Sequence, residues 1–143
     1  MKIVNGNRNK PREKKKHFHR IAIWNKASSS LQSSFPGFPI IKQSILNSKA
    51  NIIVLSEANI TEENIRNING EFPDYNIHRK PILGSKTSRI AVLTKTQGIN
   101  IQRKENLEDP STACMWFKMR LAEKTIMIAA WYRQWNQLAD VAQ

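Results

Sequence analysis

Three short runs of apolar residues constrain the fold of this chain more than any other feature of its sequence. Ile21–Trp24 and Ile52–Leu55 are four residues long, and Thr125–Trp131 is seven. Runs this short are typical of strands rather than helices, and their lack of alternation indicates strands covered on both faces. The sequence therefore predicts a sheet with other layers packed on it.

Two stretches between these runs carry helical signals. Residues 40–48 repeat apolar side chains at helical spacing. A second helix is predicted at about 62–69, because Thr61 is a suitable N-cap, two glutamates follow it, and Gly70 can end the helix. Strand, helix and strand in this order predict a right-handed parallel crossover.

The rest of the chain indicates strands that are linked by short turns. They are predicted at 75–78, 89–94, 99–101 and 114–121, and the last alternates apolar and polar residues. The predicted fold class is α/β with a tendency toward α+β and a mixed sheet. If no further sheet covers strand 114–121, its exposed apolar face favours self-association.

The charge of the chain is concentrated at its N-terminus. Residues 1–26 carry nine Lys or Arg against Glu13, a net +8 of the total +12. We expect a basic disordered arm at 1–19, a folded domain at 20–136 and a short tail at 137–143. Such an arm could neutralise phosphates, act as a nuclear address, or merely solubilise the chain. The candidate nucleic-acid contacts are Arg12, Lys14, Lys15, Lys16 and Arg20.

Composition excludes several classes of protein. One cysteine, Cys114, rules out a disulfide-stapled scaffold. No run approaches the ~20 apolar residues of a membrane span, and no secretory signal begins the chain. We therefore expect an intracellular location, with the nucleus as the address that the basic arm suggests.

Three polar residues follow apolar runs directly or one residue later. They are Asn25, Glu57 and Tyr132. If the three strands are parallel neighbours in one sheet, these side chains converge on one edge, where function gathers in such folds.

These residues lie within four motifs that resemble a known family in order and spacing. The motifs are Trp24-Asn25-Lys26, Leu55-Ser56-Glu57-Ala58-Asn59-Ile60, Ser88-Arg89-Ile90-Ala91-Val92-Leu93 and Trp131-Tyr132-Arg133-Gln134-Trp135. They resemble the endonuclease/exonuclease/phosphatase superfamily, and within it most of all the endonuclease domain of non-LTR retrotransposons. The resemblance covers about residues 20–136.

The resemblance implies half of a four-layer α/β/β/α sandwich that hydrolyses the phosphodiesters of DNA with Mg²⁺ or Mn²⁺. Glu57 would be the metal carboxylate, since Mg²⁺ favours hard oxygen ligands. Asn25 would hold the metal shell or the scissile phosphate, and Tyr132 would bond a phosphate oxygen. Glu108 resembles a frequent acidic position of the retrotransposon branch, but no role is assigned to it.

The sequence also departs from the family pattern. The family completes its site with a Gly-Asp-x-Asn loop and a terminal Ser-Asp-His, and this chain has neither. Ala27 stands where related sequences often have glycine. We therefore expect a truncated domain that is inactive by itself, and the alternative is a non-catalytic remnant that binds nucleic acid through its basic surface.

Structural explanations compete with each functional one. Glu57 could accept hydrogen bonds from nearby backbone amides, and Asn25 could form a turn. Tyr132 could be a core residue with a satisfied hydroxyl, and Cys114 a small buried hydrophobe. The four tryptophans could serve packing rather than base stacking.

Overall fold

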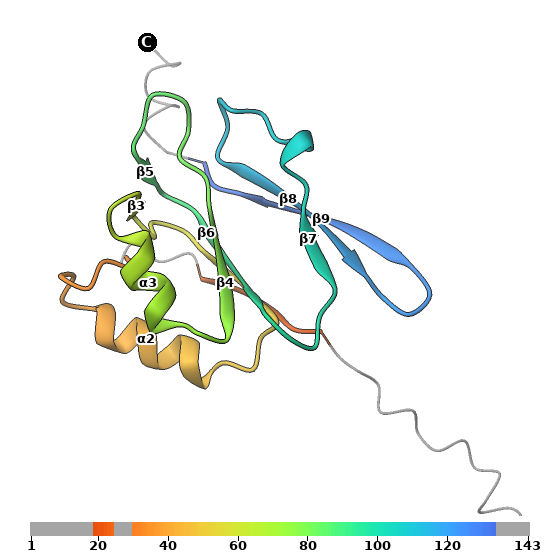
Figure 1. The fold of residues 1–143 in the computed structure, drawn as a ribbon, viewed down its shortest axis with the longest axis horizontal. Helices are drawn as coiled ribbons and strands as arrows, with labels where there is room; N and C mark the ends of the chain where they lie inside the picture. The colour runs from red at the N-terminus through yellow and green to blue at the C-terminus, as the bar shows by residue number, and fades with distance from the viewer. Residues whose placement is uncertain (1–18, 25–29, 134–143) are drawn as a thin grey trace, which may run out of the picture.

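The computed structural model describes residues 19–24 and 30–133 of the chain. Its elements are β1 (Ile21–Trp24), α2 (Phe38–Asn47), β2 (Ile52–Leu55), β3 (Ile60–Thr61), α3 (Ile65–Glu71), β4 (Tyr75–Arg79), β5 (Thr87–Ser88), β6 (Ala91–Lys95), β7 (Ile101–Arg103), the 3₁₀-helix η1 (Glu105–Leu107), β8 (Cys114–Arg120) and β9 (Thr125–Trp131). Both α-helices lie on one side of the sheet that contains β4 and β6, and β7, β8 and β9 lie on the other (Figure 1). The described part thus has helix, sheet and sheet layers.

The central sheet is mixed, which confirms the predicted fold class. Its strand order is β1-β2-β6-β4, with β1 and β2 parallel and the other two pairs antiparallel. The parallel β1–α2–β2 unit is the predicted strand-helix-strand connection. β7, β8 and β9 form a second, antiparallel sheet, and β3 pairs with β5.

Strand β2 contributes to two separate cores, which explains its continuous apolar sequence. Ile53 and Leu55 belong to the core beneath the two helices, whereas Ile52 and Val54 pack in the core between the sheets. The prediction of burial on both faces is therefore confirmed for β2. It is wrong for β1, which is an edge strand with Ile21 and Ile23 exposed.

The expectation that β9 is a neighbour of β1 and β2 is also wrong. A turn at residues 121–124 brings Thr125 opposite Arg120, so β9 pairs with β8 as an antiparallel hairpin in the second sheet. One face of β9 points to the inter-sheet core, and the other leaves Met127 and Trp131 exposed.

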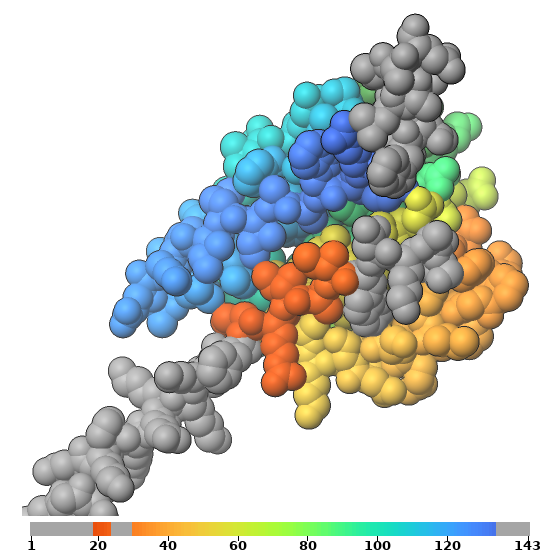
Figure 2. Space-filling view, turned by 180° about the vertical axis from the view of Figure 1, so that it is seen from behind, coloured from red at the N-terminus to blue at the C-terminus, as the bar shows by residue number. Residues whose placement is uncertain are grey.

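The predicted alternation of β8 is confirmed. Its apolar side chains, Met115, Phe117 and Met119, are buried against Ile52 and Val92 of the central sheet. The apolar face that was expected to be open is therefore covered. The exposed apolar side chains of the two sheets lie instead on β1 and β9, which Figure 2 shows on one face of the molecule.

Helix α3 begins three residues later than predicted. The Thr61 hydroxyl accepts a hydrogen bond from the Asn64 amide (3.2 Å), and the Asn64 side-chain oxygen accepts one from the Thr61 amide (2.8 Å). This reciprocal cap organises a turn at 62–64 before the helix. Gly70 lies inside the last turn, because α3 continues to Glu71. Within residues 19–24 and 30–133, no helix is long and apolar enough for a membrane crossing.

Candidate functional site

Glu57 and Tyr132 are in contact although 75 residues separate them in the sequence. The Tyr132 hydroxyl donates a hydrogen bond to Oε1 of Glu57. Glu57 follows β2 after one residue, and Tyr132 directly follows β9, where its amide bonds to the Ala113 carbonyl (2.9 Å). The predicted convergence of these two residues therefore occurs, but between two packed sheets rather than along one.

The loop that carries Glu57 has an unusual backbone. Glu57 and Asn59 both lie in the left-handed region, with φ of 59° and 53°. Between them, the Ala58 amide bonds to the Arg89 carbonyl (2.8 Å) and the Ala58 carbonyl accepts from the Leu31 amide (2.9 Å). Strained conformations of this kind persist where the surroundings fix them, and they cluster at functional sites. The loop thereby directs the Glu57 carboxylate toward Tyr132.

Arg89 binds the second oxygen of the same carboxylate. Its guanidinium Nη1 lies 2.9 Å from Glu57 Oε2 and 3.4 Å from Asn59 Oδ1. Among the described residues, the Glu57 carboxylate thus binds the side chains of Tyr132 and Arg89. The structural alternative, in which it accepts hydrogen bonds from nearby backbone amides, is not what these contacts show. Sequence reasoning assigned Arg89 no role. Antiparallel pairing of β6 with β2, which sets Ala91 opposite Leu55, is the signal that would have placed it here.

The environment of Tyr132 keeps its phenol protonated. Burial and then the hydrogen bond to the Glu57 carboxylate raise the pKa of Tyr132 to about 12. At neutral pH the group is therefore a hydrogen-bond donor, which can serve a carboxylate or a phosphate oxygen.

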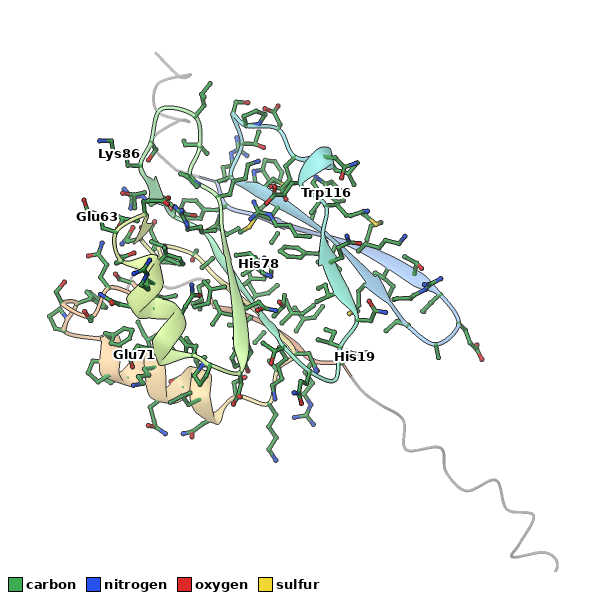
Figure 3. All side chains as sticks on the ribbon, viewed as in Figure 1. His19, Glu63, Glu71, His78, Lys86 and Trp116 are labelled. Atoms are coloured by element: carbon green, nitrogen blue, oxygen red, sulfur yellow. The ribbon has the colours of Figure 1, made fainter. Side chains whose placement is uncertain are left out.

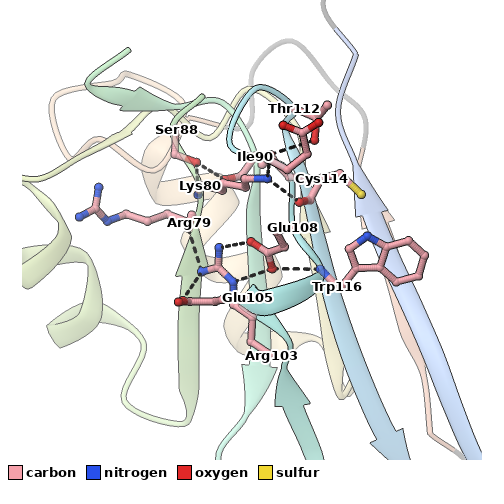
Figure 4. A network of polar contacts seen from close by, with 11 residues as sticks. Arg79, Lys80, Ser88, Ile90, Arg103, Glu105, Glu108, Thr112, Cys114 and Trp116 are labelled. Atoms are coloured by element: carbon pink, nitrogen blue, oxygen red, sulfur yellow. Dashed lines mark hydrogen bonds and ion pairs between the residues drawn. The ribbon is translucent and has the colours of Figure 1, made fainter. Parts of the chain in front are cut away.

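A basic pocket of about 280 Å³ adjoins this cluster. We use this name for the cavity whose lining includes Lys80, Arg89, Arg133, Ser85, Thr87, Ser111, Thr112 and Tyr132. Lys80 is buried, and its ammonium group donates to the carbonyl oxygens of Asp109 and Cys114 (Figure 4). Three cationic side chains and several hydroxyl donors give the pocket the chemistry that binds an anion.

Of the other predicted site residues, Arg20 alone lies in the described part of the chain, and it is remote from this cluster. Asn25, Arg12, Lys14, Lys15 and Lys16 lie outside the described residues. Arg20 is exposed at the start of β1, where its amide bonds to the Asn51 side chain (2.9 Å). Because β1 and β2 are parallel, Arg20 lies at the opposite end of the sheet from Glu57.

His78 is not part of the cluster either. It lies between the sheets (Figure 3), with its ring edge-on to Phe117 at a centroid distance of 5.0 Å and Nε2 3.0 Å from the Thr94 hydroxyl. Burial, and secondarily the charge of Arg103, lowers the pKa of His78 to about 4. This histidine is therefore an uncharged packing residue.

Glu57 alone supplies a limited donor set for a metal. Within the described ranges, no group of three or more His, Cys, Asp or Glu side chains could hold a metal ion. Mg²⁺, however, often takes only one or two carboxylates and completes its shell with water and phosphate oxygens. The hard-oxygen chemistry of Glu57 fits a metal held in that way, and not a site closed by protein ligands.

Comparison with solved structures identifies a fold neighbour. The structure is similar to the endonuclease domain of TRAS1, a telomere-specific non-LTR retrotransposon, with a TM-score of 0.54 and 13% sequence identity. The match covers 81% of this chain and 46% of that one, so the chain spans less than half of that structure. No protein-family model and no curated protein matches the sequence. The predicted likeness to a retrotransposon endonuclease domain is therefore confirmed for the fold.

Proposed function

We propose that this chain forms the phosphate-binding part of an endonuclease-type site that acts on DNA. The observation that carries the proposal is the contact of Tyr132 with Glu57 beside the basic pocket. A carboxylate, a neutral phenol and a cationic cavity are the groups needed to bind a metal-associated phosphodiester. The similarity in fold to a retrotransposon endonuclease domain supports this class of reaction.

Each residue has a distinct role in this proposal. Tyr132 donates a hydrogen bond from its hydroxyl group to a phosphate oxygen as negative charge develops there. Glu57 holds Mg²⁺ or Mn²⁺, and Asn25 holds the metal shell or the phosphate, as the sequence resemblance implies. When bound, the metal supplies Lewis-acid stabilisation of the phosphate. The basic arm and Arg20 add contacts to the nucleic-acid backbone, and the arm directs the protein to the nucleus.

We further propose that the chain does not hydrolyse DNA by itself. Hydrolysis needs a group that activates water, and such a group typically contributes ~10² to 10⁴ in rate. The described residues provide Glu57 but no cluster of three metal-ligating or acid-base side chains around it. The missing groups would come from a complementary C-terminal half.

A plasmid-nicking assay in Mg²⁺ tests this function. The full chain is compared with a version that is extended by a related C-terminal half, each also as Glu57→Gln and as Glu63→Gln. Glu63 is an exposed carboxylate in the turn before α3 and serves as the matched control. We expect nicking only by the extended protein, with loss in Glu57→Gln and retention in Glu63→Gln. Nicking by the unextended chain that requires Glu57 would overturn the proposed inactivity.

The second candidate function is metal-independent binding of nucleic acid by a non-catalytic remnant. The basic pocket favours it, because Lys80, Arg89 and Arg133 line a cavity that needs no metal to attract phosphate. Binding of a labelled duplex in EDTA that weakens in Arg133→Gln, combined with no nicking by the extended protein, would favour this function over the first.

A further inference from the structure

We propose that Arg89 is a built-in counter-cation for Glu57. A divalent metal ion must displace the Arg89 guanidinium to bind the Glu57 carboxylate. The inference rests on the proposed function, because it concerns the same site. It adds a positioning residue to that site, and it explains how a solitary carboxylate is kept neutralised when no metal is bound.

The contacts of Glu57 account for both of its oxygens. Tyr132 donates to Oε1, and Arg89 approaches Oε2 to 2.9 Å. Each carboxylate oxygen has two lone pairs, so a metal ion can share an oxygen with a hydrogen-bond donor, and the charge of the donor decides whether it can stay. The phenol is neutral and can remain beside a metal ion, whereas the guanidinium carries a positive charge that repels it.

Arg89 has the freedom that such displacement requires. Its side chain is 46% exposed, against 29% for Glu57, and its second contact, with Asn59, is long at 3.4 Å. The same side chain lines the basic pocket. When it leaves Glu57, the guanidinium can turn to a phosphate oxygen in that pocket, so metal binding at Glu57 and phosphate binding at Arg89 favour each other.

A titration of the full chain with Mn²⁺ alone tests this competition. The electron paramagnetic resonance signal of the free ion monitors how much Mn²⁺ remains unbound. The variants are Arg89→Gln, Glu57→Gln and Arg66→Gln. Arg66 is an exposed arginine on α3, so its variant matches the loss of one charge away from the site. Because an exposed ion pair is worth up to about 1 kcal/mol, we expect Arg89→Gln to bind Mn²⁺ up to about fivefold more tightly. Arg66→Gln should match the unmodified chain.

Two further variants keep the test decisive. Arg89→Lys retains the charge but has one point of contact, so its affinity should fall between those of the unmodified chain and Arg89→Gln. Tyr132→Phe removes the hydrogen bond to Glu57 Oε1 without removing a charge. It should therefore not reproduce the tighter Mn²⁺ binding expected of Arg89→Gln. Thermal unfolding of each variant verifies the fold.

The outcomes separate this inference from the proposed function. If Arg89→Gln binds Mn²⁺ no better than the unmodified chain while Glu57→Gln loses binding, the metal site stands and the competition by Arg89 is refuted. If Glu57→Gln binds Mn²⁺ as the unmodified chain does, or if neither the chain nor Arg89→Gln binds it, the proposed metal site fails together with the inference.

Discussion

Arg103 and Glu108 form a bidentate ion pair where the two sheets meet (Figure 4). Nε and Nη2 of Arg103 lie 3.0 and 2.8 Å from the two carboxylate oxygens, and the Glu108 side chain is only 5% exposed. Arg103 also donates to the Arg79 carbonyl of β4, and Glu108 accepts from the Trp116 amide of β8. Arg103 thus joins the two sheets, and Glu108, for which the sequence indicated no role, binds both Arg103 and strand β8.

Removal of the Glu108 carboxylate should destabilise the fold strongly. Glu108→Ala leaves the largely buried Arg103 guanidinium with only the exposed Glu105 carboxylate as a counter-charge, and the loss of a buried partner typically costs about 3 kcal/mol of unfolding free energy. Glu105→Ala is the control, because Glu105 lies 3.7 Å from the same guanidinium but is 76% exposed, so its loss should cost less than about 1 kcal/mol. Urea unfolding measures both, and equal losses would contradict a structural role specific to Glu108.

His78 should make the fold sensitive to mild acid. Its pKa is about 4 in the folded chain and about 6.5 when unfolded, so only the unfolded state takes up a proton as pH falls through this interval. The contribution of His78 to the free energy of unfolding is therefore intact above pH 6.5. It is lost as the pH falls toward 4, and the loss is at most about 3 kcal/mol. In His78→Gln, urea midpoints at pH 7 and 4.5 should differ less than in the unmodified chain. An unchanged difference would contradict this prediction.

The bond between Tyr132 and Glu57 should be visible in an alkaline titration. The pKa of Tyr132 is raised to about 12, and burial also raises that of Tyr75, the other tyrosine of the chain. Glu57→Gln removes the acceptor charge and should lower the Tyr132 pKa, while Tyr132→Phe should delete its step from the phenolate absorbance near 295 nm. Folded-state stability should therefore decline as pH rises from 10 toward 12, and less so in Tyr132→Phe. A Tyr132 step that Glu57→Gln leaves in place would argue against the bond.

The local sequence pattern is sufficient to predict most strands, but it does not predict which strands pair with one another. The runs at β1, β2 and β9 have the predicted bounds, because apolar side chains and turn residues act within a few positions. Sheet membership depends on contacts that are distant in sequence, so the assignment of β9 beside β2 failed. The burial of β8 was likewise misjudged, since its cover, the central sheet, comes from another part of the chain.

The candidate site was predictable only where motifs named it. Glu57 and Tyr132 follow strand ends, and the resemblance to the endonuclease family names both. Arg89 also lies in one of the motifs, but no role followed from it, because its contact with Glu57 arises from the antiparallel register of β6 against β2. The basic pocket is similarly a product of loops that meet only after folding.

The N-terminal arm, which lies outside the described residues except at its end, should dominate the salt dependence of DNA binding. Seven positive charges lie between Arg8 and Arg20. If about half contact phosphates, the slope of log affinity against log salt should be roughly −3, with little sequence preference. Deletion of residues 1–19 should flatten this slope, whereas Arg66→Gln should not. An unchanged slope after the deletion would assign the binding to the folded domain.

The edge strand β1 should mediate association between copies of the chain. Among the strands that the structure describes, β1 pairs with β2 alone, and its Ile21 and Ile23 side chains are 47% and 71% exposed. Unpaired edge strands with apolar side chains are templates for pairing with another chain, and a lysine at such an edge opposes it. Ile23→Lys should therefore shift sedimentation toward the monomer. Ile40→Lys is the matched control, because Ile40 is 74% exposed but lies on helix α2. Equal shifts in both variants would show that added charge, and not the edge of the sheet, controls association.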